Sequence, residues 1–243
     1  MDAVLEIRNY SKVYSGNKKA VDSLNLSVKA GEIHAFIGHN GAGKTTTIRA
    51  VVGIMDFDEG EILINGHSVK DDPVKCKSIT AYIPDNPDLY DYVTGIQYLN
   101  YMCDMFSVPA EERVSRIQKY ADVLNLTDSL GDLISSYSHG MKQKLALIGA
   151  FVHSPKLLVL DEPFVGLDPE ASFHLKKIMR ELCEAGTAIF FSTHVLEVAE
   201  KLCDKVTIIN DGKLIESGTM EEIKGSHSLE DVFMEVVENE RQV

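Results

Sequence analysis

Cysteine is scarce in this sequence, and its few copies are not spaced as ligands of a metal. The four cysteines, Cys76, Cys103, Cys183 and Cys203, are far apart, and no Cys-x-x-Cys or Cys/His ligand spacing occurs. This arrangement excludes a zinc site, because such sites draw their ligands from closely spaced pairs. We expect four reduced thiols rather than a disulfide framework.

Long apolar runs are also missing. No uninterrupted apolar segment approaches the roughly 20 residues that span a bilayer. Residues 1–6 lack the basic and then apolar layout of a signal peptide. We therefore expect a cytoplasmic protein that reaches a membrane only through a partner.

Basic residues are outnumbered by acidic ones. The chain has 24 Lys and Arg against 37 Asp and Glu, which gives a net charge of −13. A nucleic-acid surface needs clusters of Lys and Arg to neutralise phosphates, so we expect no nucleic-acid partner. Binding of a single nucleotide needs only a local positive site and is not excluded.

Strand patterns dominate the first part of the chain. Residues 1–32 alternate apolar and polar side chains, which predicts short antiparallel strands. Asn65-Gly66 lies between two apolar stretches and is typical of a hairpin turn with positive φ at both central positions. We therefore predict an antiparallel β subdomain at the N-terminus.

In the rest of the chain the spacing of apolar residues changes twice. From about residue 88 to 152 the spacing is helical, with Thr94 as a cap and Pro109 opening a helix. Beyond that point apolar strands alternate with helices, which is typical of a parallel sheet with helices on both faces. We predict one α/β domain over residues 1–243, in which 1–87 and 153–243 form the core and about 88–152 form an inserted helical lobe.

A complete phosphate-binding loop follows the apolar residues 33–37. It reads glycine, four residues, then Gly-Lys-Thr, and a helical stretch follows it. Glycines let several backbone N–H groups point at one phosphate, and the helix adds its positive end. Lys44 offers a charge to the outer phosphates and Thr45 a hydroxyl ligand for Mg²⁺. The predicted phosphate-binding residues are Gly38, His39, Asn40, Gly41, Ala42, Gly43, Lys44, Thr45 and Thr46.

A second acidic motif ends the apolar segment 157–160. Asp161 and Glu162 follow this expected strand, and ligands of open α/β sheets bind where parallel strands end. Alone, the pair would fit an ordinary acidic turn. Beside a phosphate loop, it predicts that Asp161 holds Mg²⁺ and that Glu162 orients and polarises the attacking water.

Five further features, in their order and spacing, resemble the nucleotide-binding subunit of ABC transporters. Tyr14 lies where the family places an aromatic ring that stacks on adenine. Tyr137-Ser138-His139-Gly140-Met141 resembles the family signature, usually Leu-Ser-Gly-Gly-Gln. Gly166-Leu167-Asp168 resembles the loop that crosses between subunits, and His194 resembles the switch histidine near the γ-phosphate. Asp85 stands where the family has a glutamine that links the two lobes, and it is a further candidate ligand of Mg²⁺.

This resemblance implies a P-loop NTPase fold and an ATP hydrolase that uses ATP and Mg²⁺, with Glu162, His194 and Lys44 as catalytic residues. It also implies a head-to-tail dimer, formed with a second copy or with a related cassette. Each ATP would lie on residues 38–46 of one subunit and be covered by Ser138 and Gly140 of the other. The remaining partner would be a separate membrane-spanning permease, which would hold the chain at the inner face of the cell membrane.

Each single feature also has a plainer reading. Tyr14 fits a half-buried strand residue, His194 a histidine satisfied by its neighbours, and Asp168 a simple helix cap before Pro169. Tyr90 and Tyr92, near the segment where the family contacts its permease, fit either that contact or the core of the lobe. The joint order of the motifs favours the functional readings of Tyr14, His194 and Asp168, whereas both readings of Tyr90 and Tyr92 stay open.

The motifs depart from the family pattern at two places. Asp85 keeps acceptor oxygens but loses the donor of an amide, so the link between nucleotide and helical lobe is altered. His139 and Met141 replace Gly and Gln of the signature, whereas Ser138 and Gly140 keep the hydroxyl and the backbone N–H that can contact a γ-phosphate. We expect activity to be retained.

The segments around Asp85 and the signature look like bacterial exporter cassettes, including those for drugs and peptide antibiotics. We therefore expect an exporter, with an importer subunit as the nearest alternative. A soluble ABC ATPase that acts on ribosomes or DNA would carry two cassettes or long coiled-coil inserts. A non-hydrolysing regulator would not need Glu162 and His194.

Overall fold

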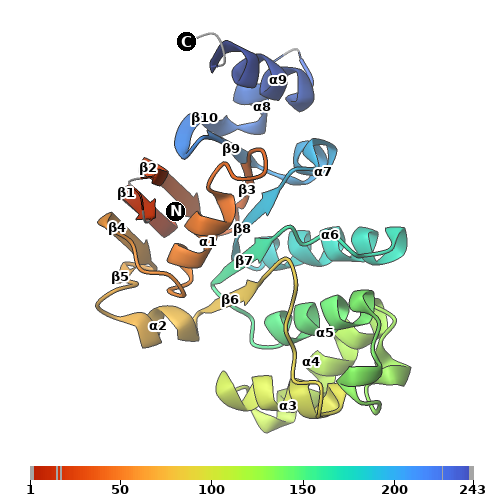
Figure 1. The fold of residues 1–243 in the computed structure, drawn as a ribbon. Coiled ribbons are helices and arrows are strands. Elements are labelled where there is room, and N and C mark those ends of the chain that lie inside the picture. Colours follow the sequence, from red (N-terminus) through yellow and green to blue (C-terminus); the bar gives the residue numbers. More distant parts are fainter. Residues whose placement is uncertain (1–2, 15, 17, 226, 241–243) are drawn as a thin grey trace.

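The computed structural model describes residues 3–14, 16, 18–225 and 227–240, and only the backbone of residues 236–240. Two sheets and a set of helices make up this part of the chain (Figure 1). The predicted α/β fold is confirmed, whereas the boundaries of the helical lobe stay a prediction. The first two residues of the segment 1–6 lie outside the described residues.

The first sheet is antiparallel and has the strand order β2-β1-β4-β5. Its strands are β1 (Ala3–Tyr14), β2 (Lys18–Lys29), β4 (Glu59–Ile64) and β5 (His67–Ser68). The predicted turn between β4 and β5 is confirmed, because Asn65 and Gly66 have φ of 50° and 79°. The prediction of short strands in residues 1–32 was wrong, since β1 and β2 each have 12 residues and pair along nearly their whole length.

The second sheet is mostly parallel and has the order β10-β9-β3-β8-β7-β6. Its strands are β3 (Ile33–Ile37), β6 (Thr80–Ile83), β7 (Leu157–Asp161), β8 (Ala188–Thr193), β9 (Lys205–Asn210) and β10 (Lys213–Thr219). Only the edge strand β10 runs antiparallel to its neighbour among these described strands. β3 lies between β8 and β9, so the segment that follows it starts from the middle of the sheet.

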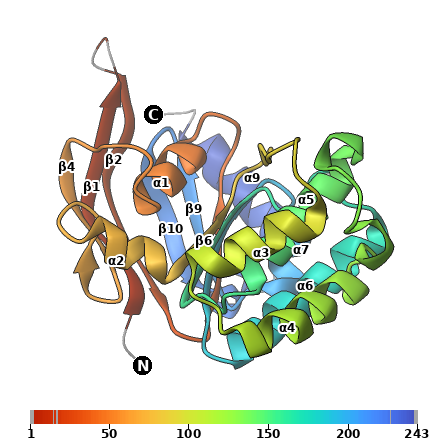
Figure 2. The same ribbon diagram turned by 90° about the horizontal axis from the view of Figure 1, so that it is seen from below.

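The helices are α1 (Lys44–Val51), α2 (Pro73–Ser78), α3 (Gly95–Met105), α4 (Ala110–Val123), α5 (His139–Phe151), α6 (Pro169–Glu184), α7 (Leu196–Leu202), α8 (Met220–Lys224) and α9 (Leu229–Glu240), with short 3₁₀ turns at Thr127–Ser129 and Ile134–Ser136. α3, α4 and α5 gather at one end of the molecule, and α8 and α9 lie at the other (Figure 1). The view from below places β1, β2 and β4 on one side of the parallel sheet and α3–α6 on the other (Figure 2). No described helix combines the length and apolar character needed to cross a bilayer.

Strand alternation divides the interior into two hydrophobic cores. In β3, Ile33, Ala35 and Ile37 pack into the core that includes α5 and α6, whereas Phe36 points to the core shared with β1 and α1. This is the period of two that a strand buried on both faces requires. The parallel sheet is therefore covered on both sides, and its strands are fixed in position.

Local signals place the helices that matter for the site. Thr94 Oγ1 accepts from Gln97 N at 3.3 Å while Gln97 Oε1 accepts from Thr94 N at 2.9 Å, a capping box that starts α3. Pro109 precedes α4, as predicted. Ser138 caps α5 by accepting from Met141 N at 3.3 Å.

The centre of the parallel sheet should dominate stability. Phe190 of β8 is fully buried, and its ring lies 5.4 Å from that of Phe36. We expect Phe190→Ala to lower the free energy of unfolding by about 3–5 kcal/mol, because truncation leaves a cavity. Urea unfolding followed by circular dichroism measures this loss.

The matched control is Phe173→Ala, because Phe173 is 65% exposed on α6. It should change the same free energy by no more than about 0.5 kcal/mol. Equal effects of the two substitutions would contradict the assignment of the core.

Candidate functional site

The loop between β3 and α1 winds against neighbouring strands at its glycines. Gly41 and Gly43 have φ of 88° and 108°, backbone conformations that residues with a side chain rarely adopt. A Cβ on Gly38 would lie 2.5 Å from the Ile209 carbonyl oxygen, and one on Gly43 would lie 2.6 Å from that of Ala20. The loop is therefore held close to β9 and β2, which leaves its other side for a ligand.

Lys44 is the first residue of α1, and its ammonium is enclosed by the loop. Nζ donates to the carbonyl oxygens of Gly38 at 2.6 Å and His39 at 3.2 Å, and lies 3.8 Å from Glu162 Oε1. Burial lowers the pKa of Lys44. A buried cation aimed into a loop of backbone donors is suited to binding a polyanion.

Asp161 and Glu162 lie where β7 ends, and Ser192 of β8 holds both. The Ser192 hydroxyl donates to Asp161 Oδ1 and accepts from Glu162 N at 3.0 Å. Asp161 Oδ2 is buried and has no hydrogen-bond partner among the described residues. Burial raises the pKa of the Asp161 carboxyl. One oxygen of this carboxylate is thus committed to the fold, and the other remains available to a ligand.

Glu162 carries backbone strain and a histidine partner. Its φ is 49°, which is uncommon for a residue with a side chain and is typical of functional sites. Glu162 Oε2 lies 2.9 Å from His194 Nδ1 and also accepts from His194 N at 3.4 Å. The structure therefore brings together Lys44, Glu162 and His194, which the sequence predicts as catalytic residues.

The residues predicted to hold Mg²⁺ fit that ion. Thr45, Asp85 and Asp161 line one cavity, and the charge of Asp85 adds to the larger effect of burial in raising the pKa of Asp161. No three His, Cys, Asp or Glu side chains converge on a metal position in the described part of the chain. Mg²⁺ needs only one or two protein carboxylates when phosphates supply further oxygens, so the free Asp161 Oδ2 and a hydroxyl are a suitable donor set.

The phosphate loop and the carboxylates open into one polar cavity of about 570 Å³. At one end Tyr14 is 44% exposed, and its hydroxyl lies 3.3 Å from Thr46 Oγ1. An exposed ring held at this place can stack on a base. The predicted residues that line the cavity are Tyr14, His39, Asn40, Gly41, Gly43, Lys44, Thr45, Thr46, Asp85, Asp161 and Glu162.

Sequence reasoning missed five residues of this region. Lys18, Lys19, Ala20 and Asp211 line the cavity, and the Ser192 hydroxyl bonds to Asp161 and to Glu162 N. The signals were present but general: two lysines at the start of a strand, an Asp-Gly turn, and a serine two residues before His194. None of them indicates a ligand until the strands are placed side by side.

Ser138 and Gly140 lie apart from this cavity, because no residue of α5 is among the described residues that line it. They stand at the start of α5, where Ser138 is exposed. Asp168 caps α6 by accepting from Ala171 N at 2.7 Å, which supports its plainer reading as a cap. Within one chain, the signature and the phosphate loop do not form a common site.

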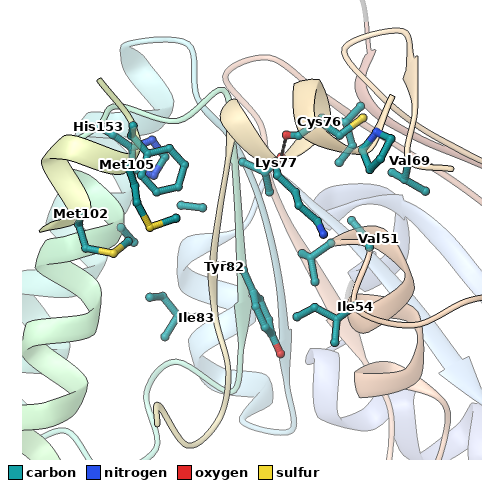
Figure 3. Close-up of a pocket in the computed structure, with 18 of the residues that line it drawn as sticks. Val51, Ile54, Val69, Cys76, Lys77, Tyr82, Ile83, Met102, Met105 and His153 are labelled. Atoms are coloured by element: carbon teal, nitrogen blue, oxygen red, sulfur yellow. Dashed lines mark hydrogen bonds between the residues drawn. The ribbon is translucent and has the colours of Figure 1, made fainter. Parts of the chain in front are cut away.

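A second cavity, of about 310 Å³ and mostly apolar, lies among the end of α1, α2, β6, α3 and α5. Met102, Met105 and His153 line one side, and Val51, Ile54 and Lys77 line the other (Figure 3). The His153 ring stacks on Phe106 at 3.7 Å between centroids, and burial lowers its pKa to about 4. Ile54 and Met105 remain 63% and 58% exposed at its edge.

Tyr90 and Tyr92 are exposed rather than part of a core. Their exposed fractions are 61% and 95%, and the Tyr90 ring meets that of Tyr101 edge to face. Of the two readings that the sequence leaves open for them, the structure rules out the core of the lobe.

Comparison with known proteins gives the same family throughout. The profile of the family described as "ABC transporter" matches residues 21–165. "Uncharacterized ABC transporter ATP-binding protein YhcH" of Bacillus subtilis (strain 168) is 38% identical over 220 residues, 89% of this chain and 70% of that protein. "Linearmycin resistance ATP-binding protein LnrL" of the same organism is 33% identical over 216 residues, 89% of this chain and 69% of that protein.

The fold comparison agrees. A solved structure described as "Structure of ATP binding subunit of ABC transporter" superposes with a TM-score of 0.93 at 33% identity, over 96% of this chain and 99% of that one. The chain therefore belongs to the ABC transporter family, as an ATP-binding subunit that hydrolyses ATP to drive transport.

Proposed function

We propose that this chain is the ATPase subunit of an exporter, and that it works with Mg²⁺ as a dimer beneath a separate permease. The observation that carries the catalytic part is the cluster at the end of β7. There Glu162 lies 2.9 Å from His194 and 3.8 Å from Lys44, beside the free oxygen of Asp161. Such an arrangement suits phosphoryl transfer, which needs charge neutralisation and an aligned water more than covalent chemistry.

Each residue of the cluster has a role that follows from its surroundings. Lys44 neutralises the outer phosphates, and residues 38–46 bind the remaining oxygens through backbone N–H groups. Glu162 accepts a proton from the attacking water, and His194 holds the Glu162 carboxylate in position. Thr45 and Asp161, with Asp85 beside them, would hold Mg²⁺, which when bound adds positive charge at the phosphates. The Tyr14 ring stacks on the adenine of ATP.

A second cassette completes the site in this proposal. Ser138 and Gly140 are outside the cavity of their own chain, yet the start of α5 carries N–H groups suited to a phosphate. A head-to-tail dimer would bring them to the ATP of the other subunit. Closure on ATP and opening after hydrolysis would then shift the population of two states.

The permease would dock on the apolar cavity between α3 and the end of α1. A cavity with Ile54 and Met105 exposed at its edge is suited to apolar side chains of a partner. Tyr90 and Tyr101 extend this surface with two exposed rings. Such docking would place the chain at the inner face of the cell membrane.

Export is favoured over import by resemblance in sequence. LnrL carries linearmycin resistance in its name, and this chain covers 69% of it at 33% identity. The segments around Asp85 and Ser138 resemble exporter cassettes in the same way.

The role of Glu162 predicts the effect of removing its charge. Glu162→Gln should lower ATP turnover by at least about 100-fold, because a general base is lost, while ATP binding is kept. Steady-state phosphate release and equilibrium ATP binding measure the two properties. Glu111→Gln, at an exposed site on α4, is the control, and wild-type turnover in Glu162→Gln would refute the assignment.

The docking surface predicts which substitutions release the permease. Met105→Glu should reduce, by about tenfold, the membrane protein captured with this chain from cross-linked native membranes, because a charge would enter the apolar cavity. Mass spectrometry quantifies the captured proteins. Val114→Glu, on an exposed site of α4 outside the cavity, should capture as the wild type does. Capture of ribosomal or DNA-repair proteins without any membrane protein would overturn the transport reading.

Direction of transport predicts where the substrate accumulates. A strain carrying Glu162→Gln should retain inside its cells a compound that the wild type releases, because closure without hydrolysis stops the cycle. Untargeted mass spectrometry of cells and medium compares the two strains. Enrichment of a compound in the medium of the variant strain would indicate an importer instead.

A further inference from the structure

The unusual signature residue His139 packs on the loop that follows the carboxylates. A Cβ on Gly166 would lie 2.7 Å from His139 Cδ2 and 2.9 Å from Nε2, so the imidazole rests directly against the Gly166 backbone. Gly166 has φ of +80° and presents only hydrogen on that side. This contact exists because His139 carries a ring where the related signature has glycine.

Two neighbouring contacts hold the same pair of segments together. A Cβ on Gly140 would lie 3.1 Å from the Gly166 carbonyl oxygen, so the two backbones are close. Lys144, one turn along α5, has its Nζ 3.2 Å from Asp168 Oδ2. The start of α5 is therefore fixed to residues 166–168 at three successive points.

Residues 166–168 directly follow a turn that starts at Glu162, the candidate catalytic residue. Val165 N donates to the Glu162 carbonyl oxygen at 3.1 Å, which closes this turn over residues 162–165. Only residues 163–165 separate Glu162 from the glycine under the His139 ring.

Asp85 offers a weaker connection between the two parts. Its carboxylate accepts from the adjacent Asn86 N at 3.0 Å, and among the described residues no hydrogen bond or ion pair joins Asp85 to α3, α4 or α5. The side chain is exposed. In the described part of the chain, the position that links nucleotide to helices in the related pattern therefore holds an acceptor whose one hydrogen bond lies within its own segment.

We propose that this chain couples its nucleotide site to the start of α5 through the contact of His139 with Gly166, with His139 as a positioning residue. The ring sets where Ser138 and Gly140 stand relative to Glu162 of the same chain. The signature would then meet the ATP of the second subunit in step with Glu162 at the ATP of its own. This inference rests on the proposed function, because it requires that the signature serve the ATP of a second subunit.

A double-mutant cycle on ATP turnover tests the contact. Gly166→Ala should lower kcat by about tenfold in the wild-type background, since its methyl group and the ring cannot both keep their places. In the His139→Gly background the same substitution should lower kcat much less. The affinity of the monomer for ATP should stay constant in all three variants, because neither residue lines the nucleotide cavity.

Two control variants separate the contact from backbone strain and from chemistry of the ring nitrogens. Gly186→Ala also places alanine at a left-handed position, with φ of +100°, but its Cβ would meet nothing within 4 Å, so kcat should be unchanged. His139→Phe keeps a planar ring of similar reach without nitrogen atoms and should retain the wild-type kcat. Urea unfolding of every variant shows that the comparison is made between folded proteins.

The outcomes divide clearly. If the effects of His139→Gly and Gly166→Ala on kcat are additive while the wild type hydrolyses ATP, this inference is overturned and the proposed function stands. Loss of kcat in His139→Phe equal to that in His139→Gly would also overturn it, because the ring would then act through its nitrogens. A wild type that binds ATP but shows no turnover would overturn the proposed function and this inference with it.

Discussion

The parallel pairing of β3, β7 and β8 is the constraint on which the rest of the molecule depends. In this register Ile37 lies beside Thr193 and Asp161 beside Ser192, so three segments leave the sheet at the same edge. The phosphate loop lies more than 100 residues before the carboxylates and His194 in sequence, and no local preference could bring them together. Burial of β3 on both faces fixes that register, because a slip by one residue would exchange the two cores.

Much of this arrangement could be predicted from sequence wherever a local rule decides the structure. Thr94, Asn65-Gly66 and Asp168-Pro169 signal a cap, a turn and a helix start through chemistry within a few residues. The phosphate loop and the acidic pair are equally local, which is why Lys44, Asp161 and Glu162 could be predicted, whereas His194 was predicted from its place in the family pattern. The lengths of β1 and β2 could not be predicted, because they depend on pairing with each other and with β4.

Contacts across the fold were the part that sequence left open. Ser192 was an unremarked strand residue until β7 lay beside β8. Tyr90 and Tyr92 precede α3, and their exposure depends on how this segment lies on its neighbours. The spacing of apolar residues in the sequence does not reveal that arrangement. The approach of His139 to Gly166 joins a helix start to a loop some 30 residues later, and only the glycine hints that something must come close.

The Ser192 hydroxyl carries one proton, yet it serves two partners: it donates to the Asp161 carboxylate and accepts from the Glu162 amide. Alanine would leave a backbone donor and a carboxylate oxygen without partners at once, and threonine would add a methyl group at a fully buried position. A lineage could therefore alter this position only through an unfavourable intermediate or by changing several residues together. The hydroxyl therefore constrains evolution, because it makes the acidic pair at the end of β7 depend on one residue of the neighbouring strand β8.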